Sequence, residues 1–199
     1  MVDSPKPSLK ERQWKLREDA VLDAASELML DKGYNAMTMD DIANHVGISK
    51  ATLYQHFPSK HDLVISVACR TVDRAYDLMV SIPTSLPASE RFKLLIEKVV
   101  DVRFGPNQPT YFEAVSEIVE ILGKEHPFIQ KEARNLKFIR DVLENAQKEG
   151  AVVPGISAPV AVQVILGTLR CVEIERAIKR GEMTPFEIAD TLKRMMLRA

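Results

Sequence analysis

A short stretch between Val46 and His61 combines residue types that bind a polyanion. It holds two lysines and the rings of Tyr54, His56 and Phe57, but no acidic residue. The remainder of the first sixty residues contains nine acids. Lysine and tyrosine side chains donate hydrogen bonds to phosphate oxygens, and short polar side chains near the start of a helix can reach base edges. The pattern indicates a local surface for nucleic acid.

Two short helices with a tight turn between them are predicted to position these residues. The first begins at Thr38, with Asp41 as its capping partner, and ends at Gly47. The second runs from Ser49 to Phe57, and Pro58 closes it. Glycine tolerates the left-handed backbone that such a turn requires. The residues spaced to pack the two helices together are Ile42, Ala43, Val46, Ile48 and Leu53.

The sequence around this turn forms a longer motif. It reads KGY, then MTMDDIA, then VGISKATLYQHFPSKHDL, between Lys32 and Leu63. This motif resembles the TetR family of transcriptional regulators, and the resemblance covers about residues 17 to 65. It implies a helix-turn-helix that binds double-stranded DNA through Thr38, Ser49, Lys50, Ala51, Thr52, Tyr54, Gln55, His56 and Lys60.

Within that set, the resemblance implies two roles. Lys50, Ala51 and Thr52 face the major groove, whereas Thr38, Tyr54, His56 and Lys60 contact phosphates. Two residues have a second interpretation: Tyr54 as a packing residue, and His56 as a partner of the negative end of its helix. Some relatives carry a base-contacting basic residue where this chain has Asp40. The resemblance therefore gives no support here for a base contact from the first of the two helices.

Helical periodicity continues through the rest of the chain and predicts an all-α fold of about nine helices. We expect a basic arm and helix-turn-helix domain over residues 1–58 and a larger ligand-binding and dimerisation domain over 59–199. The arm is either a solvated tail or a further phosphate contact. Outside the helix-turn-helix, the predicted helices run from Leu9 to a left-handed cap at Gly33, then over 59–80, 89–104, 110–123, 127–149, 158–180 and 184–198. Capping boxes, formed by Ser8 with Glu11 and by Thr184 with Glu187, are predicted to start the first and the last of them.

The helix predicted over 158–180 is apolar around nearly its whole circumference. A surface helix is apolar along one stripe only, so this one is expected to bury two faces. Gly167 in its middle costs about 1 kcal/mol relative to alanine, and a close approach of another helix would explain that cost. We predict a homodimer formed through 158–180 and 184–198, as the resemblance also implies.

The middle helices supply candidate walls for an apolar or amphipathic small-molecule effector, although ordinary core packing explains most of them as well. Arg103 continues the apolar stripe of its helix, so it either pairs with an anionic ligand or extends its charged end to solvent. The candidate ligand-binding residues are Phe92, Ile96, Val100, Arg103, Phe104, Tyr111 and Phe112.

Composition excludes other classes of function. The net charge is −1, so DNA contact must come from a local basic surface. The chain has two cysteines and no motif of spaced metal ligands, and we expect neither a metal site nor a cofactor. It carries no signal peptide core and no apolar run long enough to cross a membrane, which favours the cytoplasm.

The resulting prediction is a dimeric repressor that a small molecule releases from a two-fold symmetric operator. One alternative is an enzyme on an α-helical bundle, but no nucleophile elbow, phosphate loop or metal-binding helix motif supports it. Another is a DNA-binding protein whose C-terminal part serves association alone. Repressor and activator are not distinguished by the sequence.

Overall fold

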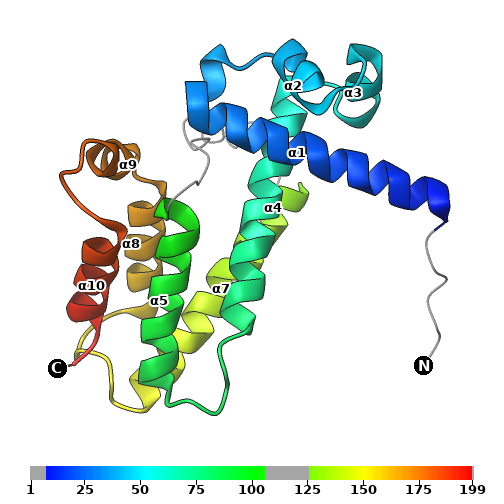
Figure 1. Cartoon of the computed structure of the whole chain (residues 1–199). Helices are drawn as coiled ribbons and strands as arrows, with labels where there is room; N and C mark the ends of the chain where they lie inside the picture. Colours follow the sequence, from blue (N-terminus) through cyan, green and yellow to red (C-terminus); the bar gives the residue numbers. More distant parts are fainter. Residues whose placement is uncertain (1–7, 106–125, 199) are drawn as a thin grey trace. The chain divides into compact units, whose positions relative to one another are not determined.

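The computed structural model describes residues 8–105 and 126–198 and divides the chain into two compact units, with a boundary after Val67 (Figure 1). The described residues form helices joined by loops, with one isolated β-bridge, which confirms the predicted all-α fold. None of the helices in these two ranges is both long and apolar enough to cross a membrane. The helix predicted over 110–123 lies outside the described residues.

The N-terminal unit contains α1 (Leu9–Ala36), α2 (Met39–Val46), α3 (Lys50–His56) and the first turns of α4 (Lys60–Val80). A capping box between Ser8 and Glu11 starts α1, as predicted. Helices α1 and α2 pack together, as do α2 and α3. Their shared core holds the fully buried side chains of Val21, Ala25, Met29, Ile42 and Leu53.

Gly33 interrupts α1 near its end. Its φ of 79° is positive, as predicted, but its ψ of 165° lies outside the left-handed helical region. This combination is accessible essentially to glycine alone. A last short turn follows, and Met37 N–H closes it by donating to the Gly33 carbonyl at 3.2 Å. The glycine thus redirects the chain toward α2 rather than simply ending α1.

The C-terminal unit contains the rest of α4 with α5 (Ala88–Phe104), α7 (Pro127–Lys148), α8 (Ala158–Arg170), α9 (Val172–Lys179) and α10 (Pro185–Met196). Helix α5 packs against α7 and α10, and α7 also packs against α8. The centre of this core holds the fully buried side chains of Phe92, Leu95, Ile96, Leu143 and Ile165.

The single helix predicted over 158–180 is wrong, because the structure breaks it into α8 and α9 at Cys171. That residue takes extended backbone angles of φ −74° and ψ 111°. The break leaves the Leu169 carbonyl without a helical partner, and Arg103 Nε of α5 donates to it at 2.8 Å. In a continuous helix this carbonyl would accept from a backbone N–H. Here the buried Arg103 side chain, from another helix, supplies the donor instead.

The last helix begins as predicted and ends two residues earlier. Thr184 and Glu187 form a capping box, with Pro185 in the first turn. After Met196 the chain is extended, and Leu197 pairs with Val152 in the isolated bridge. The backbone N–H of Arg198 donates to the Ala151 carbonyl at 2.8 Å, which ties the end of the chain to the loop before α8.

Candidate DNA-binding site

Capping side chains fix the start of both helices of the predicted helix-turn-helix. Thr38 Oγ1 accepts from the Asp41 N–H at 3.1 Å, and the Asp41 carboxylate accepts from the Thr38 N–H at 2.8 Å. Gly47 takes the left-handed conformation with φ 75° and ψ 33°, as predicted. Ser49 Oγ then accepts from the Thr52 N–H at 3.1 Å and caps α3. The chain direction into α3 is therefore set locally.

Helix α3 packs with one face and exposes the other. Leu53 is fully buried and the following Phe57 is 3% exposed, so both belong to the core. The Thr52 hydroxyl lies 2.8 Å from that of Ser49, which leaves its methyl group as the free part of the side chain. The exposed residues of α3 are Lys50, Ala51, Tyr54 and Gln55, all of them predicted DNA contacts.

Lys50, the first residue of α3, forms an ion pair with Asp40 of α2. The Nζ to Oδ1 distance is 2.7 Å, and both side chains are more than half exposed. The hydrogen bond to Asp40 raises the pKa of the Lys50 ammonium. The carboxylate therefore stands within reach of a residue predicted to contact bases, which sequence spacing did not indicate.

Lys60, at the start of α4, lies over the ring of Tyr34. Its Nζ is 4.1 Å from the ring centroid, close enough for a cation–π interaction. Partial burial lowers the pKa of this ammonium. The ring restrains the lysine side chain, so a phosphate contact made by Lys60 starts from an ordered side chain.

His56 differs from the other predicted phosphate ligands. Its ring packs against Trp14 of α1, with 3.8 Å between ring centroids. Neither ring nitrogen is solvent-accessible or hydrogen bonded to any described group. Burial, and secondarily the nearby Arg17, lowers the pKa of His56. In this structure the ring thus acts as a packing surface for Trp14 and does not present a donor to DNA.

The candidate effector residues of α5 lie in the core of the C-terminal unit. Phe92 and Ile96 are fully buried, Val100 is 1% exposed and Phe104 is 7% exposed. These side chains belong to one apolar cluster with residues of α7, α8 and α10. The other two candidates, Tyr111 and Phe112, lie outside the described residues.

Arg103 is buried and already has an anionic partner within the chain. Its Nη2 donates to Glu175 Oε2 of α9 at 2.6 Å, and both side chains are about nine-tenths buried. Both expectations for Arg103 are therefore wrong in this structure: the side chain does not extend to solvent, and its anionic partner is Glu175 rather than a ligand. Its position instead ties α5 to the break between α8 and α9.

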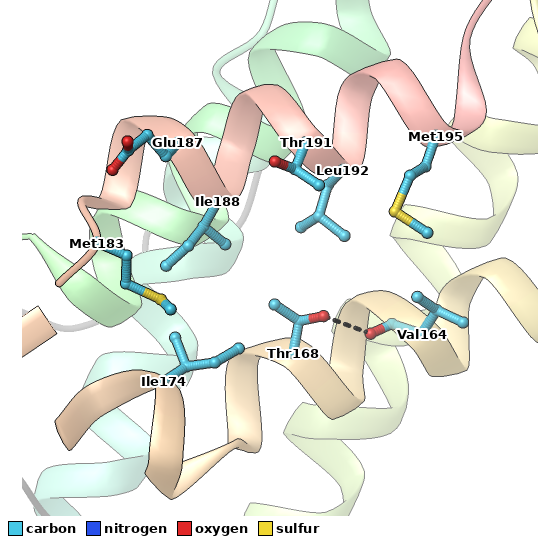
Figure 2. A pocket seen from close by; sticks show the side chains of 9 residues that line it. All are labelled: Val164, Thr168, Ile174, Met183, Glu187, Ile188, Thr191, Leu192 and Met195. Carbon is cyan, nitrogen blue, oxygen red and sulfur yellow. Dashed lines mark hydrogen bonds between the residues drawn. The ribbon is translucent and has the colours of Figure 1, made fainter. Parts of the chain in front are cut away.

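An apolar groove of about 450 Å³ opens on the C-terminal unit between α8, α9 and α10 (Figure 2). Ile188 and Leu192 of α10 point toward Thr168 and Ile174 across it in that view. The residues that line it are Val164, Thr168, Ile174, Met183, Glu187, Ile188, Thr191, Leu192 and Met195. Its walls come from the two segments predicted to form the dimer. No group of three or more metal-binding side chains is found among the described residues.

Comparison with known proteins identifies the N-terminal unit. Residues 21–67 match the family model described as bacterial regulatory proteins, tetR family. This segment is therefore identified as a DNA-binding region of the TetR type. The match covers α2, α3 and the packed part of α1, which are the elements that position the exposed face of α3.

Two curated relatives are regulators. The HTH-type transcriptional activator FasR of Mycolicibacterium smegmatis is 38% identical over 86 residues, which are 43% of this chain and 39% of that protein. The alignment thus spans less than half of FasR. The fatty acid metabolism regulator protein of Bacillus subtilis is 24% identical over 153 residues, covering 75% of this chain and 77% of its own length.

Among solved structures, AibR in complex with isovaleryl coenzyme A and operator DNA matches with a TM-score of 0.70. The identity is 21%, and the match covers 91% of this chain and 98% of AibR. At that identity the comparison establishes the fold alone. The matching family model and the two curated relatives are all described as regulators.

Proposed function

We propose that this protein is a TetR-family regulator, a dimeric repressor that binds a two-fold symmetric operator and leaves it when a small molecule binds. The exposed face of α3, held by the Ser49 cap and the Gly47 turn, carries this proposal. An α-helix whose exposed N-terminal residues are short or basic fits the major groove.

The exposed residues divide by chemistry into base and phosphate contacts. Lys50 and the Thr52 methyl group lie at the start of α3, where a groove-bound helix meets base edges. The Tyr54 hydroxyl and the Lys60 ammonium can donate hydrogen bonds to phosphate oxygens. Thr38 already uses both its hydroxyl and its N–H in the α2 cap, so a phosphate contact at this position is expected from the next backbone N–H groups in the first turn of α2.

Salt dependence separates the two roles. Lys60→Ala should weaken binding to all duplexes alike and flatten the slope of log K against log salt by about 0.9 for each phosphate that the lysine no longer neutralises. Lys50→Ala should instead relax preference at specific base pairs. Lys137→Ala is the matched control, since this exposed lysine pairs with Asp141 in α7 of the other unit. Unchanged salt dependence for Lys60→Ala would remove that residue from the site.

Exposed apolar residues on α8 and α10 support a dimer through this face. Val160 and Val164 of α8 are 61% and 40% exposed, and Phe186 and Met195 of α10 are 73% and 57% exposed. Val164 and Met195 line the apolar groove, while Val162 and Ile165 on the other side of α8 are buried in the chain's own core. A methyl group added at Gly167 would meet nothing within 4 Å in the single chain. Helix α8 therefore buries one apolar face in the core of its own chain and exposes the other to solvent in the single chain.

Sedimentation of matched variants tests the dimer. The wild type should sediment at twice the 22.4 kDa chain mass at micromolar concentration. Val164→Glu with Met195→Glu should shift it to the monomer, because a charge buried in an apolar interface is costly. Val80→Glu places the same charge on an exposed apolar residue of α4 and should leave the dimer intact. A wild-type monomer would overturn the proposal.

The effector is proposed to be amphipathic, and acyl-coenzyme A is the first class to test. The predicted wall residues of α5 are apolar, as the environment of an acyl chain must be, although in this structure they pack within the core. The names of relatives agree with this class: one is a fatty acid metabolism regulator, and AibR was solved with isovaleryl coenzyme A.

Operator release by acyl-coenzyme A of increasing chain length tests both effector and direction of control. Release by one chain length, with coenzyme A alone inactive, is the expected result. Tighter operator binding after addition of an acyl-coenzyme A would instead indicate a ligand that promotes DNA binding. One relative, FasR, is named an activator, so positive control is also considered. No binding by any member, measured as thermal shift, would favour a C-terminal unit that serves association alone.

A further inference from the structure

The ion pair between Asp40 and Lys50 sits where the two helices of the helix-turn-helix begin. Asp40 lies in the first turn of α2 and Lys50 is the first residue of α3. Their side chains are 59% and 58% exposed, and 2.7 Å separates Oδ1 from Nζ. A hydrogen-bond donor and an acceptor therefore stand side by side at the exposed start of α3.

Asp40 has no part in the capping of α2. That task belongs to Thr38 and to the next residue, Asp41, whose carboxylate also pairs with Lys32 at 2.7 Å. The carboxylate of Asp40 can accept further hydrogen bonds, and the ammonium of Lys50 has three donors. Pairing with Lys50 cancels much of the repulsion that an isolated carboxylate would meet near phosphates.

The chemistry of the pair matches one base pair in the major groove. A G·C pair presents the guanine N7 and O6 acceptors, followed by the N4 amino donor of cytosine. Lysine donates well to guanine N7 and O6, and aspartate accepts from cytosine N4. An A·T pair has a single acceptor on either side of its amino donor, so the Lys50 ammonium would lose there the second of the two acceptors that guanine offers.

We propose that Asp40 and Lys50 act together as one base-contacting unit that selects a G·C pair in each half-site. Lys50 donates to guanine O6 and N7, and Asp40 accepts from the N4 amino group of the paired cytosine. The inference rests on the proposed binding of DNA by the exposed face of α3. It gives Asp40 a direct role in specificity, in addition to its contact with Lys50.

A binding selection on random duplexes at fixed salt tests the proposal, with the wild type, Asp40→Ala and Lys50→Ala compared. Both variants should lose the G·C preference at the same position of each half-site. The loss should be about fivefold or more for each half-site. Glu27→Gln is the matched control, because Glu27 is an exposed acid of the same unit that pairs with His45. It removes the same charge and should keep the preference.

Base analogues then assign the two contacts separately, in the operator obtained from that selection. A 2-pyrimidinone nucleotide, which lacks the cytosine amino group, should weaken wild-type binding and leave Asp40→Ala unaffected. 7-Deazaguanine, which lacks N7, should weaken the wild type and leave Lys50→Ala unaffected.

Three outcomes would overturn the inference while leaving the proposed function in place. The first is an unchanged motif for Asp40→Ala with tighter binding to all sequences, as for Glu27→Gln. The second is an A·T preference at the position that Lys50→Ala relaxes, and the third is an equal effect of 2-pyrimidinone on the wild type and Asp40→Ala. Failure of the wild type to select any symmetric motif would instead contradict the proposed function itself.

Discussion

Replacing Arg103 with methionine is expected to destabilise the C-terminal unit strongly. The substitution keeps much of the side-chain volume but leaves the Glu175 carboxylate buried without its 2.6 Å partner. Removing one member of a buried ion pair typically costs about 3–5 kcal/mol, because an uncompensated charge remains. Lys179 Nζ stays within 3.3 Å of the other Glu175 oxygen, which places the expected loss near the lower end, at about 3 kcal/mol.

Urea unfolding at one fixed protomer concentration measures this loss, since the proposed dimer would make stability depend on concentration. Arg103→Met, Glu175→Leu and the double variant complete a double-mutant cycle. The double variant should be more stable than Arg103→Met alone, because it buries no unpaired charge. A loss below about 1 kcal/mol for Arg103→Met, or strict additivity in the cycle, would refute this prediction.

Three further predictions concern the DNA-binding unit. Gly47→Ala should lower the free energy of unfolding by about 1–2 kcal/mol, because φ is positive at this position. The variant should also bind the operator more weakly in a mobility-shift assay. Wild-type stability of the variant would contradict the prediction. Ser49→Ala should lower the free energy of unfolding in urea by about 1 kcal/mol through loss of the α3 cap. Ser49→Asn should keep most of the wild-type stability, and an equal loss in both variants would argue against capping. The bonds from Lys32, and then from Thr38, lower the pKa of Asp41 to about 2, below its ordinary 3.8. Its contribution to stability is therefore present above pH 3.8 and lost as the pH falls toward 2, so the gap in stability between wild type and Asp41→Asn should close over that range. A gap independent of pH would contradict the assignment.

Features that depend on neighbouring residues were predictable from the sequence. The capping boxes at Ser8 and Thr184 and the left-handed turn at Gly47 formed as expected. Each depends on bonds that span only a few residues, so residue type and spacing determine it. The start of α3 and the exposure of Lys50 follow from such bonds as well.

Features that depend on distant contacts were not predictable. At the break at Cys171, Arg103 donates a hydrogen bond to the Leu169 carbonyl, and this bond joins residues 66 positions apart. The apolar pattern of residues 158–180 is the same for a broken and a continuous helix, so hydrophobic periodicity did not reveal the break. The enclosure of His56 by Trp14 of α1 and the pairing of Asp40 with Lys50 likewise require the tertiary arrangement of two helices.

In the proposed complex, two copies of α3 contact successive major-groove faces of one operator. A binding selection with the wild-type chain on random duplexes tests this central claim most directly. We expect a two-fold symmetric motif whose half-sites lie about 34–36 Å apart, or a multiple of that distance. Enrichment of no motif, or of a single asymmetric site bound by one chain, would contradict it.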